Sequence, residues 1–339
     1  MIVLKYIGKR LLISVFVIFG LSIVIFVISR VVPGDPARLA LGARATPEAV
    51  AALTEQMHLN DSFPQQYFYW LKSALHGDLG QSLITQNAVK ADILTYLPRT
   101  LELVVIAGLM LVIGSILLGT LAAAFQDSFL DNLIRVLSYV GVAVPSFVLA
   151  VLFVLYFGYI NPIIPVIGRL GSEYVTPAAV TGFMSIDCLL AGDLPAFWNV
   201  LGHAFLPALA LAAGPMFQEA RIIRSAMTDN KGRDYLLLMK SYGLPRWKII
   251  GKYLLKPSVI PAVSTLGMDL ATLMGNAFMI ETIFNWPGLS KYGMTAMLNK
   301  DLNAIAGVII VYGIVFVLVN LVVDVISAYL DPRIRLKAV

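Results

Sequence analysis

The sequence has one cysteine and few histidines, which excludes several kinds of site. Cys188 stands alone, so the chain can form neither an intramolecular disulfide nor a cysteine metal cluster. The three histidines, His58, His76 and His203, are far apart and do not show the spacing of zinc ligands. We therefore expect no metal and no cofactor in this chain.

Sequence motifs of common hydrolases are also missing. There is no Gly-x-x-x-x-Gly-Lys-Ser/Thr phosphate loop, so the chain should not hydrolyse ATP by itself. The metalloprotease motif His-Glu-x-x-His and the esterase motif Gly-x-Ser-x-Gly are absent too. A membrane enzyme is disfavoured, and we predict no catalytic residues.

Charged residues are scarce and apolar residues dominate. The chain is 13% charged and 59% hydrophobic, with a mean hydropathy of +0.83, whereas soluble domains carry about 25% charged residues. The excess apolar surface must face a lipid bilayer, which indicates an integral membrane protein. The net charge of +5 does not indicate nucleic-acid binding, because Lys and Arg mark the cytoplasmic side of membrane proteins.

Several apolar stretches are long enough to cross a hydrocarbon core of ~30 Å, which takes about 20 helical residues. The first is too long for a signal peptide and no small-residue cleavage site follows it, so we interpret it as a retained anchor. The predicted fold class is an all-α integral membrane protein with six transmembrane helices. The predicted spans are 7–32, 100–125, 133–160, 203–222, 258–280 and 303–330.

The distribution of Lys and Arg predicts that both termini are cytoplasmic, because most of the 25 basic residues then lie inside. A long segment, 33–98, then lies outside, and Thr46-Pro47 within it is typical of a helix N-cap followed by proline. An aromatic-rich helix over 63–75 is expected either to lie on the membrane surface or to pack on the spans. The second outer segment, 161–202, is rich in Pro and Gly and predicts an irregular lid or vestibule.

The loop from 227 to 257 is basic, amphipathic and longer than a turn between two spans requires. This pattern suggests a helix held at the cytoplasmic face for another protein to bind. Gly243 also fits a helix C-cap, which is compatible with a docking role because the cap would end that helix. Its basic residues are Lys231, Arg233, Lys240, Arg246, Lys248, Lys252 and Lys256.

Asp269 falls inside the fifth predicted span, where a buried carboxylate costs several kcal/mol unless it faces water or a partner. Thr272 and Asn276 follow at i+3 and i+7 and share its helix face. These residues either line a solute path or form an interhelical hydrogen-bond cluster. We favour the path.

Turn motifs at fitting spacing give the chain a family resemblance. They are Pro33-Gly34-Asp35-Pro36, His76-Gly77-Asp78-Leu79-Gly80, Leu97-Pro98-Arg99-Thr100-Leu101-Glu102-Leu103, Arg224-Ser225-Ala226-Met227, Glu281-Thr282-Ile283-Phe284-Asn285-Trp286-Pro287-Gly288-Leu289 and Asp331-Pro332-Arg333-Ile334-Arg335. With these motifs the chain resembles ABC transporter permeases of the dipeptide, oligopeptide and nickel family, and among them the dipeptide-permease B-type subunit.

The resemblance implies a type I ABC importer permease fold with a large extracytoplasmic segment after the first helix. It implies an N-terminal transmembrane helix over 1–32, an extracytoplasmic segment over 33–97, a permease domain over 98–330 with the coupling loop 227–257, and a cytoplasmic tail over 331–339. The implied function is import of di- and oligopeptides across a bacterial or archaeal cytoplasmic membrane. The implied partners are a second homologous permease, two ATP-binding subunits that bind ATP and Mg, and an extracytoplasmic solute-binding protein.

The family's coupling motif, Glu-Ala-Ala-x-x-x-Gly, aligns on Gly243, but Leu237, Leu238 and Met239 occupy its leading positions, so the acidic residue is missing. Asp269 also departs from the family, since many relatives carry an amide there; a carboxylate favours cationic or amine-bearing solutes. The resemblance implies that the ATPase-coupling residues are Asp234, Tyr235, Leu238, Lys240, Ser241, Gly243, Leu244, Pro245 and Arg246.

The outer turn motifs are tight turns that stop helices and are also expected to contact the solute-binding protein. These contact residues are Asp35, Asp78, Trp286, Pro287 and Gly288. The alternative cargo of the same machine is nickel or another chelated metal, glutathione, or another amine-bearing solute. A secondary transporter would need inverted repeats or broken helices around a midplane site, and the sequence indicates neither.

Overall fold

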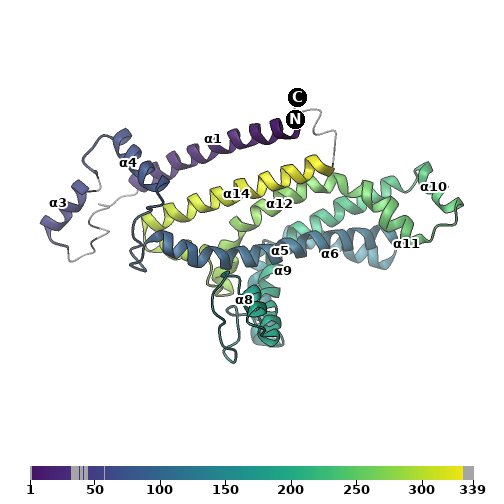
Figure 1. Ribbon diagram of the computed structural model, residues 1–339. Coiled ribbons are helices and arrows are strands. Elements are labelled where there is room, and N and C mark those ends of the chain that lie inside the picture. Colours follow the sequence, from purple (N-terminus) through teal and green to yellow (C-terminus); the bar gives the residue numbers. More distant parts are fainter. Residues whose placement is uncertain (1, 32–37, 39–40, 42–44, 57, 331–339) are drawn as a thin grey trace.

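Backbone polar groups in lipid must be paired within the protein, and helices satisfy this requirement along a single span. The computed structural model describes residues 2–31, 38, 41, 45–56 and 58–330, and long helices dominate it (Figure 1). Within these residues the only β pairing is a bridge between Gln81 and Ala88. The predicted all-α class is confirmed. The elements are α1 (Ile2–Val31), α3 (Pro47–Gln56), α4 (Phe63–Leu75), α5 (Val89–Ala124), α6 (Phe129–Ala143), α7 (Ser146–Phe153), the π-helix η1 (Val154–Ile160), α8 (Met184–Leu190), α9 (Leu194–Asn230), α10 (Asp234–Ser241), α11 (Arg246–Lys248), the π-helix η2 (Ile249–Leu254), α12 (Leu255–Ile283), α13 (Leu289–Leu298) and α14 (Leu302–Leu330).

Four helices in the described part of the chain, α1, α5, α9 and α14, are long and apolar enough to cross a membrane by themselves. Two bent helix pairs raise this number to six if each pair forms one span. The presence of several spans is therefore confirmed, while the count of six stays a prediction.

The third predicted span is not a straight helix. The axis turns by 106° between Phe129–Ala143 and Ser146–Ile160. Pro145 lies at the break, where it fixes its own φ and pushes Val144 out of the helical region. The two helices together are long and apolar enough for one bent span, so the predicted span over 133–160 stays a prediction.

Two other helices are longer than predicted. α5 begins at Val89 and continues through Pro98, although proline removes one helical hydrogen bond. α9 continues to Asn230, so the first residues of the predicted loop 227–257 are still helical. The predicted docking segment therefore begins directly after α9.

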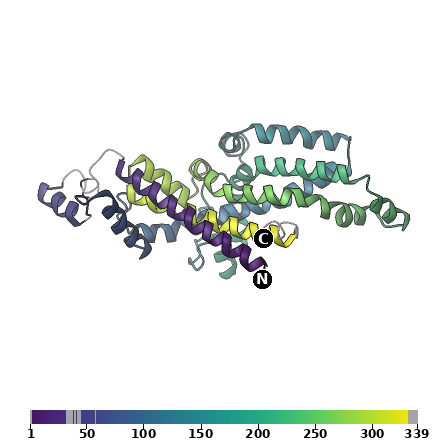
Figure 2. The same ribbon diagram turned by 90° about the horizontal axis from the view of Figure 1, so that it is seen from above.

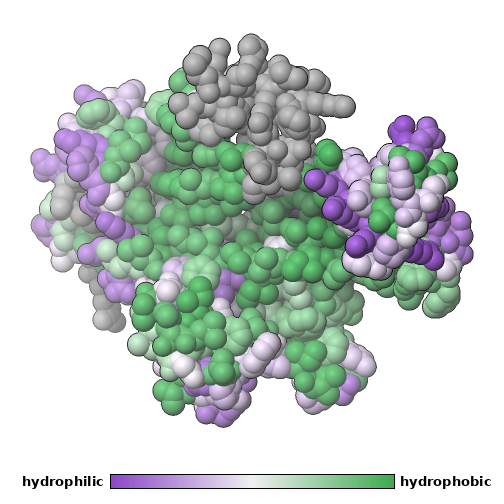
Figure 3. Space-filling view, turned by 45° about the vertical axis from the view of Figure 1, so that its right-hand side comes forward, coloured by the Kyte–Doolittle hydropathy of each residue, from purple (hydrophilic) through white to green (hydrophobic). Residues whose placement is uncertain are grey.

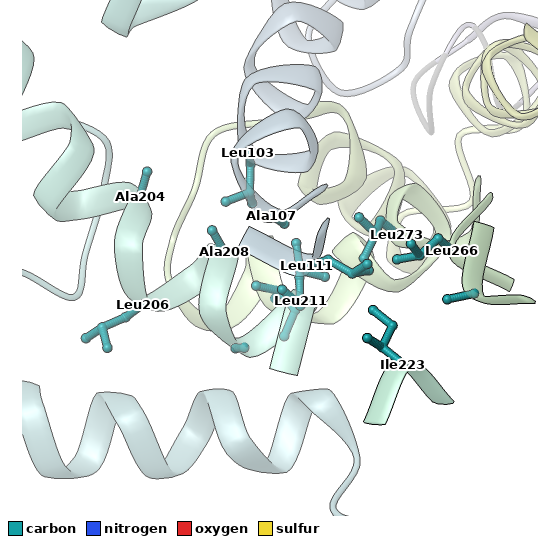
Figure 4. Packing of buried hydrophobic residues seen from close by; sticks show 14 of the residues in the cluster. Leu103, Ala107, Leu111, Ala204, Leu206, Ala208, Leu211, Ile223, Leu266 and Leu273 are labelled. Atoms are coloured by element: carbon teal, nitrogen blue, oxygen red, sulfur yellow. The ribbon is translucent and has the colours of Figure 1, made fainter. Parts of the chain in front are cut away.

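The main core lies where α5, α9 and α12 pack together. Small residues let these helices approach closely, as in other membrane bundles. A Cβ on Gly119 of α5 would lie 2.7 Å from the backbone oxygen of Ala220 on α9, so this contact requires glycine. Figure 4 shows the packing around Leu103, Ala107, Leu111, Ala208, Leu211, Leu266 and Leu273.

The aromatic helix α4 packs on α1, which itself lies along α14 (Figures 1 and 2). Phe26 of α1 contacts the rings of Phe63, Tyr67 and Trp70. Tyr67 also hydrogen-bonds Ser22 through its hydroxyl group at 2.7 Å. Of the two arrangements expected for residues 63–75, the structure shows packing on a span. The predicted N-cap at Thr46 is confirmed, since its Oγ1 accepts the Ala49 N–H at 3.3 Å.

The surface agrees with a membrane location. In Figure 3 apolar side chains cover the middle of the visible face, and polar side chains gather at its left, right and lower edges. Many large apolar side chains of α1, α5, α6 and α14 are exposed in this single chain. Lipid or another subunit must cover them.

Candidate functional site

The predicted docking segment folds as α10, a short helix that projects from one end of the bundle (Figure 1). Gly243 follows it with φ +71°. The N–H of Gly243 donates to Lys240 O at 2.9 Å, and the N–H of Leu244 donates to Met239 O at 3.3 Å. These two bonds form a Schellman cap, in which glycine adopts the left-handed conformation without strain. The expected C-cap at Gly243 is therefore confirmed.

Basic side chains fix this segment to the end of α5. Lys231 Nζ donates to Ala123 O and to Gln126 Oε1, and Arg246 donates to Ala124 O at 2.8 Å. Cations are favourable there because the last carbonyl groups of a helix carry partial negative charge. Burial, together with the nearby charges of Arg224 and Arg246, lowers the pKa of Lys231.

The outer face of α10 leaves apolar side chains uncovered. Leu236 is buried against the bundle, whereas the neighbouring Leu238 is 50% exposed. Tyr242 and Trp247 are still more exposed, at 72% and 71%. The coupling residues predicted from the sequence are exposed apart from Leu244, which is half-buried. This end of the molecule therefore exposes a short capped helix with uncovered apolar side chains.

A buried ion pair holds α9 against α6 close to this segment. Arg224 donates to both carboxylate oxygens of Asp131, each at 2.6 Å. The side chain of Asp131 is completely buried and also accepts the Asp127 N–H. Bidentate pairs of this kind fix direction as well as distance. Through Asp131 the pair links α9 to α6 and to Asp127 in the turn between α5 and α6.

The polar stripe lies on one face of α12, as predicted. Thr272 and Asn276 are exposed and Asp269 is half-buried. Asn276 lines a cavity of ≈ 400 Å³ together with Ser146 and Phe147. Thr272 Oγ1 donates to the backbone oxygen of Asp269, so its hydroxyl does not reach another helix. Among the described residues Thr272 and Asn276 make no interhelical hydrogen bond, whereas the carboxyl group of Asp269 interacts with Glu219 of α9. The solute path therefore stays a prediction.

Glu219 of α9 lies beside Asp269, the first residue of this stripe. It was not among the residues predicted from the sequence. The residue is completely buried, and its Oε2 accepts the Thr265 hydroxyl at 2.9 Å. Its carboxyl group is close enough to that of Asp269 for a hydrogen bond. An acidic residue inside the predicted span 203–222 was the signal that could have identified it.

The turn after α12 is built from buried side chains. Thr100 Oγ1 donates to Glu281 Oε1 at 2.5 Å and accepts the Leu289 N–H at 2.7 Å. Trp286 is fully buried and its indole N–H donates to Arg99 O at 2.9 Å. These bonds tie the segment after α12 to α5 around Arg99 and Thr100.

The predicted contacts to a solute-binding protein are only partly available on this surface. Trp286 and Gly288 are buried within the chain, because the turn packs against α5, so neither residue is exposed to a partner. Pro287 is half-buried and Asp78 is exposed. Asp35 lies outside the described residues, as do the turn motifs at 33–36 and 331–335.

A second buried ion pair fixes the predicted lid to α5. Arg169 pairs with Glu102, and both side chains are nearly inaccessible. The other oxygen of Glu102 accepts the backbone N–H and the hydroxyl of Ser185, at 2.7 and 2.6 Å. Arg169 also lies 5.4 Å from the ring centroid of Trp286. The Glu102 carboxylate thus joins the predicted lid to α8, and Arg169 extends this contact to Trp286 in the turn after α12.

The lid carries its own network beside α8. Asp187 accepts hydrogen bonds from the Thr181 N–H and hydroxyl, both at 2.8 Å, and from the Gly182 N–H at 3.1 Å. Burial opposes ionisation of this carboxyl, but the hydrogen bonds outweigh it and lower its pKa. Burial raises the pKa of the neighbouring Cys188 thiol, which fits a packing role.

Replacing Gly288 by alanine should lower the stability of the protein by about 1–3 kcal/mol, the usual cost of overpacking. The new Cβ would lie 2.5 Å from both oxygens of Glu281 and from Thr100 Oγ1. Thermal unfolding of the purified protein in detergent measures this effect. Gly251→Ala is the matched control, because nothing lies within 4 Å of its added Cβ. Equal unfolding temperatures for the two variants would contradict the turn geometry.

Residues 115–336 match the family described as binding-protein-dependent transport system inner membrane component, and residues 3–104 match the N-terminal part of such components. The chain is 38% identical over 321 residues to the probable D,D-dipeptide transport system permease protein DdpB of Escherichia coli, covering 94% of each chain. It is 35% identical over 332 residues to the dipeptide transport system permease protein DppB of Alkalihalophilus pseudofirmus, covering 98% of this chain and 99% of the relative.

The glutathione transport system permease protein GsiC of Escherichia coli is more distant, at 28% identity over 334 residues, 98% of this chain and 100% of the relative. The matches extend over nearly the whole chain and confirm the resemblance inferred from the turn motifs. The chain belongs to the family of binding-protein-dependent transport system inner membrane components.

Proposed function

We propose that this chain is the permease subunit of an ATP-driven importer that carries di- and oligopeptides across the cytoplasmic membrane. Its family and the dipeptide permeases similar to it over nearly their full length support this function. The observation in the structure that carries it is α10, a capped helix that presents an apolar face to a partner. A membrane channel or secondary carrier has no need of such a helix.

In this function α10 and the turn after it dock on an ATP-binding subunit, which closes when it binds ATP. The hydrogen bonds of the cap at Gly243, and those of Lys231 and Arg246 to the end of α5, transmit that motion. α5 and α9 then move together with the docking helix. The contact residues are Asp234, Tyr235, Leu238, Lys240, Ser241, Gly243, Leu244, Pro245 and Arg246. The permease then alternates between two states whose populations are set by a remote ligand.

The solute passes along the α12 face that carries Asp269, Thr272 and Asn276. This face is uncovered in the single chain, and a second homologous permease would close it. Both termini lie in the cytoplasm in this arrangement, and the solute-binding protein docks at the opposite side, near Asp78 and Pro287. Two ATP-binding subunits complete the importer and bind ATP and Mg.

Uptake of a labelled dipeptide into proteoliposomes tests this function. We expect uptake by the complex with its partner subunits only when ATP and loaded solute-binding protein are both present. Gly243→Trp should assemble and lose this response, because its side chain is strained at φ +71° and stands at the docking turn. Uptake without ATP, or the failure of any ATPase to co-purify, would refute the importer.

A further inference from the structure

Two acidic side chains from different helices meet inside the bundle. Glu219 is completely buried (0% exposed) between α9 and α12, and Thr265 satisfies only its Oε2. No hydrogen-bond donor among the described side chains reaches its Oε1 or Asp269 Oδ2, although both atoms are buried. The two carboxyl groups face each other within hydrogen-bonding range. Each of the two neighbouring carboxyl groups thus keeps one buried oxygen without a donor.

No cation of the described chain neutralises this pair. The ion pairs recorded among the described residues belong to the carboxylates of Asp61, Glu102 and Asp131. Two unit charges 4 Å apart repel each other by about 4 kcal/mol even at an effective dielectric constant of 20. Two buried carboxylates in contact therefore do not both stay ionised. A single positive hydrogen-bond donor between them satisfies both orphan oxygens.

The two carboxyl groups differ in accessibility: Glu219 is inaccessible, whereas Asp269 is half-buried on the polar face of α12. Glu219 lies between the two helices, but Asp269 is half-buried at the start of the exposed line that continues with Thr272 and Asn276. Thr272 is bonded to the backbone oxygen of Asp269, so it does not occupy the Asp269 carboxyl group. Because Asp269 Oδ2 and Glu219 Oε1 are themselves buried, a ligand on this face reaches them only when the two carboxyl groups move apart.

Glu281, a fully buried acid on α12, shows the contrast. Its Oε1 accepts the Thr100 hydroxyl and its Oε2 accepts the Lys291 N–H at 3.0 Å. Both of its oxygens are thus satisfied by the fold, whereas one oxygen of Glu219 and one of Asp269 are not. Buried polar groups without partners are rare and indicate a missing ligand or proton.

From this geometry we infer that Glu219 and Asp269 bind the terminal ammonium group of the peptide in transit. The pair holds one proton in the same place when no peptide is present. This assignment rests on the proposed importer function and its path along α12. When the ammonium group enters, the shared proton leaves to water past Asp269. The site carries one net negative charge in both states, so two uncompensated charges are never exposed to the bilayer interior.

Infrared difference spectroscopy of the complex in lipid tests the shared proton. We expect the resting wild type to show a protonated-carboxyl band that Glu219→Gln/Asp269→Asn lacks. Trapping the complex with peptide-loaded binding protein should remove the same band from the wild type. Empty binding protein should leave it in place. Glu281→Gln, a buried carboxyl change elsewhere on α12, should keep this response to peptide. A band that is insensitive to peptide, or is present in the double variant, overturns the assignment.

Uptake supplies the second readout. At equal concentrations of loaded binding protein, Glu219→Gln and Asp269→Asn should each lower dipeptide uptake about tenfold, the effect of losing one charge-assisted hydrogen bond. Stimulation of ATPase activity by binding protein should persist, since the docking helix is intact. Equal loss of uptake and ATPase stimulation would indicate a merely structural pair and overturn the assignment. If the wild type itself shows no ATP-dependent uptake, the importer function fails, while the band of the resting complex still tests the shared proton.

Discussion

Leu238→Asp should reduce ATP-dependent peptide uptake at least about 30-fold, the loss expected when a contact of about 2 kcal/mol is removed from the centre of an interface. Leu238 stands 50% exposed on α10, while Leu236 two positions earlier fixes the helix to the bundle. The substitution therefore leaves the fold of the permease intact. In the complex it forces an unpaired carboxylate against the apolar surface of an ATP-binding subunit, which is costly. Uptake and co-purification of the ATP-binding subunit measure the effect together.

Leu190→Asp provides the matched control for this substitution. Leu190 is 63% exposed on α8, the short helix beside the lid. The same chemical change at a similarly exposed leucine should leave both uptake and ATPase stimulation unaffected. If both variants lose uptake equally, the loss does not come from the docking surface, and α10 is not the coupling element.

Local patterns in the sequence were sufficient to predict most of the helices and the docking cap. Apolar runs indicate spans because a helix is the only open structure that pairs its own backbone in lipid. Gly243 was recognisable as a cap because a left-handed turn strongly favours glycine. Pro145 was a local signal for the break, but the long apolar run on both sides of it suggested one uninterrupted helix.

Contacts between distant segments were not predictable in this way. Glu102 and Arg169 come from α5 and the lid, and the ion pair exists only because the fold brings them together. The burial of Trp286 likewise depends on α5, although its turn motif suggested an exposed contact. For Glu219 the sequence did contain a signal, since the rule that identified Asp269 also applies to an acid in the preceding span.

Arg169→Met should lower stability by about 3–5 kcal/mol, the cost of removing one member of a buried ion pair. The effect is large because Glu102 stays behind as a buried carboxylate with only the Ser185 groups as donors. Arg169 also donates to Gly182 O at 3.2 Å, so the lid loses its attachment together with the charge. Thermal unfolding of the purified protein in detergent measures the loss, with the exposed Lys248→Met as the control.

The double variant Glu102→Gln/Arg169→Met separates the charge from the packing. The neutral amide that replaces the Glu102 carboxylate keeps its size without its charge, so part of the lost stability should return. The coupling energy of such a cycle isolates the interaction between the two side chains. If the double variant is instead less stable by the sum of both single losses, Glu102 and Arg169 act independently. The lid would then be held by packing around Trp286 and by the Asp187 network rather than by the ion pair.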